Sequence, residues 1–243
     1  RQAKYLNDQF YPYIKKNKIS VLYQAVDSDL YTNKHNHVEK GKILVIGHMT
    51  KAKGYTDILK IIPEVCEIHP HVKFYFAGDM RKGERGVFYN QYTGENLVYE
   101  DPFLAEKTIL DSKYKNNYVN LKIIKDKEKI NHLQSMQIFL SASYSEGFSR
   151  SLLESMSMGK PTIFTPVGAH YEVFKRNIHG IIVEPGKTSQ IKDAILNLLN
   201  DEKKCEFIGY NNRKNVVKNF TLDKICMEFK SIILKTLKYE NIN

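Results

Sequence analysis

The sequence has few cysteines and no long apolar segment. Its three cysteines, Cys66, Cys205 and Cys226, are too few and too scattered for a disulfide framework or a zinc site, so we expect a reducing compartment. No apolar run approaches the ~20 residues that a membrane span requires. The first residues lack the apolar stretch of a secretory signal, and without an initiator methionine we expect a fragment. We therefore expect a cytoplasmic protein, and peripheral contact with the inner face of a membrane stays open.

The chain also lacks any long run of charge of one sign, although it is basic overall. Its 37 lysines and arginines exceed its 27 aspartates and glutamates, which gives a formal net charge of +10. A basic balance is typical of proteins that bind nucleic acid, anionic membranes or phosphorylated ligands. The lysines are spread along the chain and group only in short pairs such as Lys15-Lys16 and Lys203-Lys204. We interpret most of this charge as solvated surface, and a nucleic-acid-binding module remains an alternative function.

Apolar runs of strand length alternate with helical patterns from Lys42 onward. The run Ile43-Leu44-Val45-Ile46 is continuous and ends at Gly47, as expected for a strand covered on both faces. The predicted strands cover residues 43–46, 72–77, 118–124, 137–142, 162–165 and 180–183. The predicted helices cover residues 56–68, 103–110, 127–134, 149–158, 169–175, 189–200, 203–218 and 222–237. Strands that alternate with helices predict an α/β fold with a doubly wound, Rossmann-like parallel sheet.

Two parts of the chain fall outside this alternation. Residues 2–18 are compatible with a helix, residues 19–23 with a short strand, and residues 32–41 with a polar linker. Residues 80–117 are long for a connection between two strands, and they are rich in tyrosine and charge. Contact of this second segment with an acceptor, with a partner or with neither stays open.

Two carboxylates follow the predicted strand at 137–142. Glu146 lies in the turn beside a glycine, and Glu154 lies eight residues later in the next predicted helix. A carboxylate can accept hydrogen bonds from two neighbouring sugar hydroxyls, and it can stabilise an oxocarbenium-like transition state. Helix and turn amides can hold phosphate. The combination indicates a nucleotide-sugar site, although each acid taken alone is more often a surface residue.

A glycine and a cation follow the predicted strand at 43–46. Gly47 lets the backbone approach a ligand, and Lys53 offers a mobile cation to a diphosphate. Gly47, Gly78 and Glu146 all follow predicted strand ends, and the carboxyl ends of parallel strands meet at the edge of the sheet where ligands bind. The histidines show no metal-ligand spacing with cysteines or acids, so we expect no metal site.

Several motifs occur in a characteristic order. The most specific are Glu146-Gly147-Phe148, Leu153-Glu154-Ser155-Met156 and Gly159-Lys160-Pro161. The pattern continues with Val167-Gly168, Glu172, Gly180 and Pro185-Gly186. It is preceded by Gln24-Ala25-Val26-Asp27 and Tyr31, where Gln and Ala replace the usual Asn and Gly. From about Ser20 to Asn200 the chain resembles the carboxyl-terminal half of a retaining glycosyltransferase of the two-domain GT-B type, whose signature is E-x7-E.

The resemblance implies an enzyme that moves a hexose from a UDP-sugar or GDP-sugar to an acceptor, with retention at the anomeric carbon. Glu146 would lie near the donor sugar and Lys53 would pair with the diphosphate, so these are the candidate catalytic residues. Glu154 would bind the ribose hydroxyls. The candidate donor-binding residues are Gly47, His48, Gly147, Phe148, Ser149 and Glu154. Family members generally need no metal or other cofactor, because cationic side chains and helix N-termini neutralise the leaving diphosphate.

His48 is a departure from the family, which usually has arginine or lysine at this position. An imidazole is mostly neutral near pH 7, but a bound diphosphate favours its charged form. We therefore expect His48 to lie at the phosphates of the donor and to accept replacement by arginine.

The resemblance also implies that part of the enzyme is absent from this sequence. Residues 1–41 would be a remnant of the amino-terminal domain with the interdomain linker, and residues 42–243 would form the donor-binding domain. Because the amino-terminal domain carries most of the acceptor site in the family, we expect the chain to bind its donor and to transfer little sugar alone. The expected partners are the nucleotide sugar and that absent domain, and no nucleic acid. A nucleotide-sugar epimerase is a second enzymatic alternative.

Overall fold

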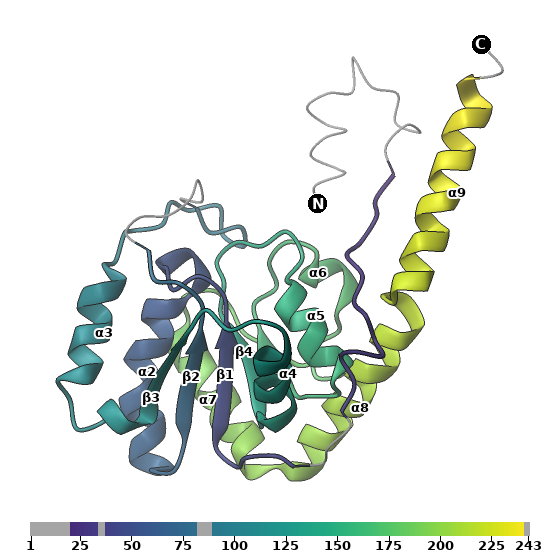
Figure 1. Ribbon diagram of the computed structural model, residues 1–243. Helices are drawn as coiled ribbons and strands as arrows, with labels where there is room; N and C mark the ends of the chain where they lie inside the picture. The colour runs from purple at the N-terminus through teal and green to yellow at the C-terminus, as the bar shows by residue number, and fades with distance from the viewer. Residues whose placement is uncertain (1–19, 34–36, 82–88, 241–243) are drawn as a thin grey trace.

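The computed structural model describes residues 20–33, 37–81 and 89–240, which Figure 1 shows as a parallel sheet between helices. Within these residues, six strands form one sheet in the order β3-β2-β1-β4-β5-β6, and every neighbouring pair is parallel. The strands are β1 (Lys42–Ile46), β2 (Lys73–Ala77), β3 (Tyr118–Lys122), β4 (Ile138–Ser141), β5 (Thr162–Phe164) and β6 (Ile181–Ile182). This order confirms the predicted doubly wound sheet and places its switch point between β1 and β4.

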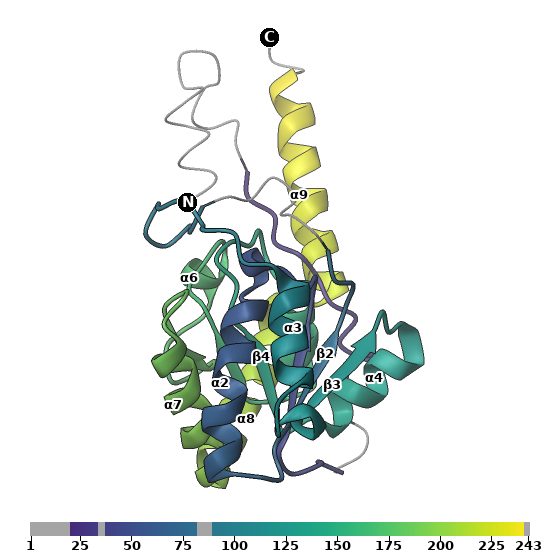
Figure 2. The ribbon, with the colours of Figure 1, turned by 90° about the vertical axis from the view of Figure 1, so that its left-hand side faces the viewer.

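Helices cover both faces of the sheet. One layer consists of α2 (Tyr55–Ile68), α3 (Pro102–Leu110) and α7 (Thr188–Asn200). The other consists of α4 (Asp126–Ser135), α5 (Arg150–Ser157) and α8 (Glu202–Asn219). The short α6 (His170–Val173) follows β5, and α9 (Leu222–Glu240) extends away from the rest of the chain in Figure 1. Figure 2 shows α2 and α7 on one side of the sheet and α4 on the other. In the described part of the chain, no helix is long and apolar enough to cross a membrane.

Two apolar clusters join the helix layers to the sheet. In β1, Ile43 packs in the cluster on the α2 and α7 side, and Leu44 packs in the cluster on the α5 and α8 side. In β4, Leu140 packs in the first cluster and Phe139 in the second. All four side chains are fully buried. Successive side chains of a strand point to opposite faces, which explains why these strands are continuously apolar. Burial of each such side chain contributes about 1.5–3 kcal/mol relative to exposure.

The observed helices and strands differ from the prediction mainly at their ends. The helix predicted at 169–175 is limited to α6, because Phe174 has an extended backbone with φ −112° and ψ 143°. The Phe174 ring is buried and packs against Phe164, with 5.5 Å between the ring centroids. Burying this ring in the core ends the helix earlier than its sequence pattern indicated.

The strand expected at 19–23 does not form in its described part, and the predicted helix at 2–18 lies outside the described residues. Tyr23 instead packs edge-on against the rings of Phe148 and Phe220, with centroid distances of 5.7 and 6.1 Å. Aromatic packing, and not pairing along the edge of the sheet, holds this segment. The apolar run was therefore a misleading signal for a strand.

Candidate functional site

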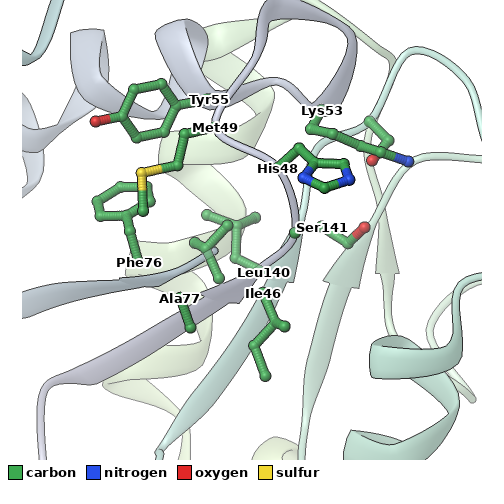
Figure 3. A pocket seen from close by; sticks show the side chains of 12 residues that line it. Ile46, His48, Met49, Lys53, Tyr55, Phe76, Ala77, Leu140 and Ser141 are labelled. Carbon is green, nitrogen blue, oxygen red and sulfur yellow. The ribbon is translucent and has the colours of Figure 1, made fainter. Parts of the chain in front are cut away.

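A pocket lies at the carboxyl edge of the sheet, where β1 and β4 are neighbours. The ends of β1, β2 and β4 and the segment that follows β1 form its walls. Figure 3 shows one side made by His48, Lys53 and Ser141 and the other by Met49, Tyr55 and Phe76. At the switch point of an open α/β sheet the connecting loops diverge to opposite faces, which leaves a crevice for a ligand.

The two predicted catalytic residues contact each other at this edge. Lys53 Nζ lies 2.8 Å from Glu146 Oε1. The hydroxyl of Ser143 donates a hydrogen bond to the same carboxylate oxygen at 2.8 Å. The side chains of Lys53 and Glu146 are 30% and 14% exposed, so the pair is partly desolvated but open to solvent. A lysine held in this way can be redirected to an anionic ligand, because its ammonium group is a compact charge on a flexible stem.

The turn after β1 brings Lys53 to this position. Lys51–Lys53 form a 3-10 turn, η2, which ends at Gly54 with φ +72°. A Cβ atom at Gly54 would lie 2.3 Å from the carbonyl oxygen of Ala142, at the end of β4. Only glycine permits this close approach, so Gly54 sets the short distance between the loop after β1 and the loop after β4.

A second glycine shapes the loop that carries Glu146. Gly168 has φ +56°, and a Cβ atom there would lie 2.2 Å from the carbonyl oxygen of Glu146. The next residue, Ala169, donates its backbone N–H to the carbonyl oxygen of Gly147 at 2.9 Å. The turn after β5 therefore packs directly on residues 142–149, the loop between β4 and α5 that carries Glu146 and is called the acidic loop below. A side chain at position 168 would displace the acidic loop.

His170 supports the same loop from a fully buried position. Its Nε2 accepts a hydrogen bond from the backbone N–H of Ser149, and its Nδ1 lies within hydrogen-bond distance of the carbonyl oxygen of Thr165, each at 3.2 Å. These two partners require a neutral ring with the proton on Nδ1. Burial lowers the pKa of His170, Glu146 and Thr165 act in the opposite direction, and Lys53 lowers the pKa further. The net shift is downward, which keeps the ring neutral at pH 7.

The stability of the protein should depend on pH through His170. The unfolded chain takes up a proton on this residue as the pH falls through about 6.5, whereas the folded chain resists protonation. Stability is thus lost as the pH falls below about 6.5, by up to about 1.4 kcal/mol per pH unit for one such histidine. We expect urea denaturation at about pH 7.5 and about pH 5.5 to show a larger loss in the wild-type protein than in His170→Gln. Burial also lowers the pKa of His132 and His179, which contribute equally to both proteins. Identical pH dependence of the two proteins would contradict this role.

His48 lies at the rim of the crevice and is 47% exposed. Its Nδ1 contacts the carboxylate of Asp79, which follows β2 and is also bound by Arg81 Nε. Burial raises the pKa of Asp79, but hydrogen bonds from Arg81 and His48 outweigh burial and lower it, so the carboxylate stays ionised. Asp79 thus fixes the imidazole through Nδ1, and a ligand in the crevice would meet His48 through Nε2.

Glu154 is held in a different ion pair. It lies on α5 and is 2% exposed, and its two carboxylate oxygens contact Lys129 Nζ at 2.7 and 2.6 Å. Lys129 comes from α4, and its ammonium group lies 5.4 Å from the centroid of the Tyr31 ring. Neither Glu154 nor Glu146 is among the residues that line the pocket between β1 and β4, but Glu146 contacts Lys53, which lines it. The structure therefore brings Lys53 and Glu146 together, whereas Glu154 is buried and paired with Lys129.

The other predicted donor-binding residues lie on the same two loops. Gly47 lines the pocket. Gly147 is exposed, with no atom within 4 Å of the position that a Cβ would take. Ser149 caps α5, because its hydroxyl oxygen accepts a hydrogen bond from the backbone N–H of Leu152 at 3.3 Å. The side chain of Phe148 packs in an aromatic cluster. Among the described residues, no three His, Cys, Asp or Glu side chains are placed to share a metal ion.

Sequence reasoning missed the residues that hold the predicted ones in place. They are Asp79, Gln91, Lys129, Ser143 and His170. Asp79 and Ser143 each lie two residues past a strand end, after β2 and after β4, and this position at the binding edge is a signal that could have singled them out. The other three carry no comparable signal, because their partners are defined by tertiary packing.

Comparison with known proteins identifies related sequences along most of the chain. The sequence model of the family Glycosyl transferases group 1 matches residues 27–215. The chain is 25% identical over 237 residues to the capsular polysaccharide biosynthesis glycosyltransferase CapM of Staphylococcus aureus, covering 92% of this chain and 57% of CapM. It is 27% identical over 241 residues to N-acetyl-alpha-D-glucosaminyl L-malate synthase of Bacillus anthracis, covering 93% and 56%. The chain spans about half the length of the curated relatives it matches.

Solved structures show the same fold. A glycosyltransferase from Rickettsia africae superposes with a TM-score of 0.75 at 20% identity, covering 97% of this chain and 61% of that one. The protein HepE from Anabaena, solved in complex with UDP-glucose, superposes with a TM-score of 0.72 at 17% identity, covering 89% and 57%. At these identities the likeness concerns the fold alone.

Proposed function

The chain belongs to the group 1 glycosyl transferases, and on that basis we propose that it binds the nucleotide-sugar donor of a retaining hexosyltransferase. The observation that carries this proposal is the contact of Lys53 with Glu146, at 2.8 Å, at the crevice between β1 and β4. Lys53 can pair with a diphosphate and Glu146 can bind a sugar. Because the two side chains are in contact, one nucleotide sugar can reach both. The proposed donor is a UDP-hexose or GDP-hexose, and the solved complex of HepE with UDP-glucose supports the first.

In the proposed complex, Lys53 turns from Glu146 to the diphosphate. Its ammonium group would neutralise the charge that develops on the diphosphate as the bond to the sugar breaks. Glu146, released from Lys53, would accept hydrogen bonds from the sugar hydroxyls and stabilise positive charge at the anomeric carbon. His48 would add a second donor through Nε2. We propose that these side chains serve in place of a metal ion, so EDTA should leave nucleotide affinity unchanged.

The proposed place of the ribose is beside Glu154. Its carboxylate can accept hydrogen bonds from both ribose hydroxyls, as acids do in other nucleotide-binding α/β folds. Lys129 already neutralises this carboxylate in a nearly dry environment. Binding of the ribose would therefore compete with, or add to, the contact between Glu154 and Lys129.

The acceptor is proposed to bind mainly to a part of the enzyme outside this sequence. The curated relatives are about twice as long as the aligned chain, which leaves room for a further domain in the complete proteins. We expect the chain to bind its donor and to transfer sugar to acceptors poorly when it is alone. Rapid transfer of sugar to an acceptor by these 243 residues alone would contradict the proposal that the acceptor binds mainly to another part of the enzyme.

A panel of nucleotides tests the proposal most simply. We expect UDP or GDP, and the matching UDP-glucose or GDP-mannose, to raise the melting temperature, with a stabilisation of about 2.7 kcal/mol at a ligand concentration of a hundred times Kd. The measurement is a thermal shift followed by calorimetric titration, with and without EDTA. Salt-sensitive binding to DNA or RNA with no response to any nucleotide would favour a nucleic-acid module. Conversion of the free sugar nucleotide to its epimer, observed by NMR, would favour an epimerase.

Replacement of His48 by arginine should preserve or improve donor binding. Arginine keeps a positive charge beside the ionised Asp79 and offers planar donors that suit phosphate oxygens. We expect the Kd for UDP or GDP to stay equal or to fall. Calorimetric titration measures this effect. A large loss of affinity in His48→Arg would show that His48 does not lie at the phosphates.

A further inference from the structure

The connection between β2 and α3 contributes a compact loop at the binding edge. Figure 1 shows the described residues that lead into α3, from 89 onward, near the carboxyl ends of the strands. Residues 89–96 fold back on themselves, because Tyr89 and Asn96 form an antiparallel bridge and Asn90 donates its N–H to the carbonyl oxygen of Glu95 at 2.7 Å. This loop belongs to the segment that did not fit the alternation of strands and helices.

Gln91 joins this loop to the loop that carries Glu146. The backbone N–H of Gln91 donates to the carbonyl oxygen of Tyr144 at 2.9 Å. The backbone N–H of Glu146 donates to the side-chain oxygen of Gln91 at 3.0 Å. The two hydrogen bonds bracket Ser145, whose carbonyl oxygen lies 3.5 Å from Lys53 Nζ. One residue thus holds the backbone on both sides of the point where Lys53 meets the acidic loop.

Glu100 anchors the other end of the segment to the loop after β1. Its carboxylate lies 3.0 Å from Lys51 Nζ and 2.8 Å from Lys60 Nζ. Burial raises the pKa of Glu100, but the hydrogen bonds from Lys60 and Lys51 outweigh burial and lower the pKa to about 2. Lys51 is itself buried and lies 2.7 Å from Asp57 on α2. The anchor therefore stays charged throughout the physiological pH range.

We propose that residues 89–100 brace the two loops of the site against each other, and that Gln91 is a positioning residue for Glu146. The proposal rests on the proposed function where it concerns the donor sugar. Gln91 holds the main chain of Glu146, and the carboxylate of Glu146 reaches Lys53 from that main chain. Removal of the side-chain acceptor frees the acidic loop and weakens contacts to the sugar, while contacts to the nucleotide remain.

The brace can be tested without any ligand by hydrogen exchange. We expect the amide of Glu146 to exchange at least tenfold faster in Gln91→Met, which keeps the length of the side chain and removes its acceptor. Gln91→Glu, which keeps an acceptor oxygen at the same reach, should restore protection. Gln137→Met is the matched control, because Gln137 accepts a hydrogen bond from the N–H of Gly41 at 2.6 Å, at the amino end of the sheet. Unchanged exchange at Glu146 in Gln91→Met would overturn the brace.

The positioning role is tested by the affinity that the sugar adds to the nucleotide. In Gln91→Met we expect the ratio of UDP-glucose affinity to UDP affinity to fall at least fivefold. If the nucleotide panel selects GDP, the same ratio is measured with GDP-mannose and GDP. A merely structural effect would lower both affinities together. An unchanged ratio would overturn the positioning role. Absence of any nucleotide binding by the wild-type protein would count against the proposed function, and hydrogen exchange at Glu146 would still decide on the brace.

Discussion

Lys53→Met should weaken binding of UDP or GDP roughly ten- to a hundredfold, because a hydrogen bond to a charged group is worth about 1.5–3 kcal/mol. The variant keeps the apolar stem of the lysine and removes only the ammonium group, which lies 2.8 Å from Glu146. The loss should be larger for the diphosphates than for UMP or GMP, because the diphosphate is the proposed partner. Calorimetric titration of the mono- and diphosphates measures this difference.

Lys192→Met is the matched control for this prediction. Lys192 lies 2.8 Å from Glu64 and is 27% exposed, which resembles the contact distance and exposure of Lys53. It joins α7 to α2 and is not among the residues that line the pocket. We expect Lys192→Met to bind every nucleotide as the wild-type protein does. Equal affinity of Lys53→Met and the wild-type protein for UDP and GDP would remove Lys53 from the site.

Glu154→Gln should abolish most nucleotide binding and, in particular, the preference for ribose. The variant keeps the volume of the side chain and removes the charge that makes hydrogen bonds from hydroxyls strong. In the wild-type protein we expect UDP or GDP to bind roughly tenfold or more tightly than the 2′-deoxyribose analogue, at the usual strength of a charge-assisted bond. In Glu154→Gln the two forms should bind equally weakly. Competition calorimetry with both forms measures the preference.

Loss of the buried contact with Lys129 should also lower the stability of Glu154→Gln, so folding has to be measured in parallel. Removing one partner of a buried ion pair typically costs about 3–5 kcal/mol. Lys129→Met is the informative companion, because it frees the carboxylate of Glu154 and perturbs the same pair. A role in ribose binding requires Glu154→Gln to lose the ribose preference and Lys129→Met to keep it. A retained preference in folded Glu154→Gln would exclude Glu154 from the ribose site.

Much of the fold could be predicted because its signals are local. Continuous apolar runs such as residues 43–46 and 138–140 mark strands covered on both faces, and each is followed by a polar turn. The alternation with helices fixes a parallel sheet, and hence the edge at which Lys53 and Glu146 lie. The local signal failed where aromatic packing decided the structure, as at Tyr23, where no strand forms, and at Phe174, where α6 ends early.

The interactions that orient the site could not be predicted, because they join distant parts of the chain without a periodic pattern. Gln91 and Glu146 are 55 positions apart, and Gln91 belongs to an irregular connection. Lys129 looks like any surface lysine of a helix until α4 and α5 are packed together and Glu154 is found beneath it. The burial that makes His170 a neutral acceptor for Ser149 is likewise a property of the folded chain.

Mapping UDP and GDP by backbone amide chemical shifts tests the proposed site most directly. We expect the largest changes in residues 47–54 and 145–151, which follow β1 and β4 at the switch point of the sheet. Changes concentrated at the amino ends of the strands, near Gly41 and Gln137, or no change at millimolar nucleotide, would contradict a donor site formed around Lys53 and Glu146.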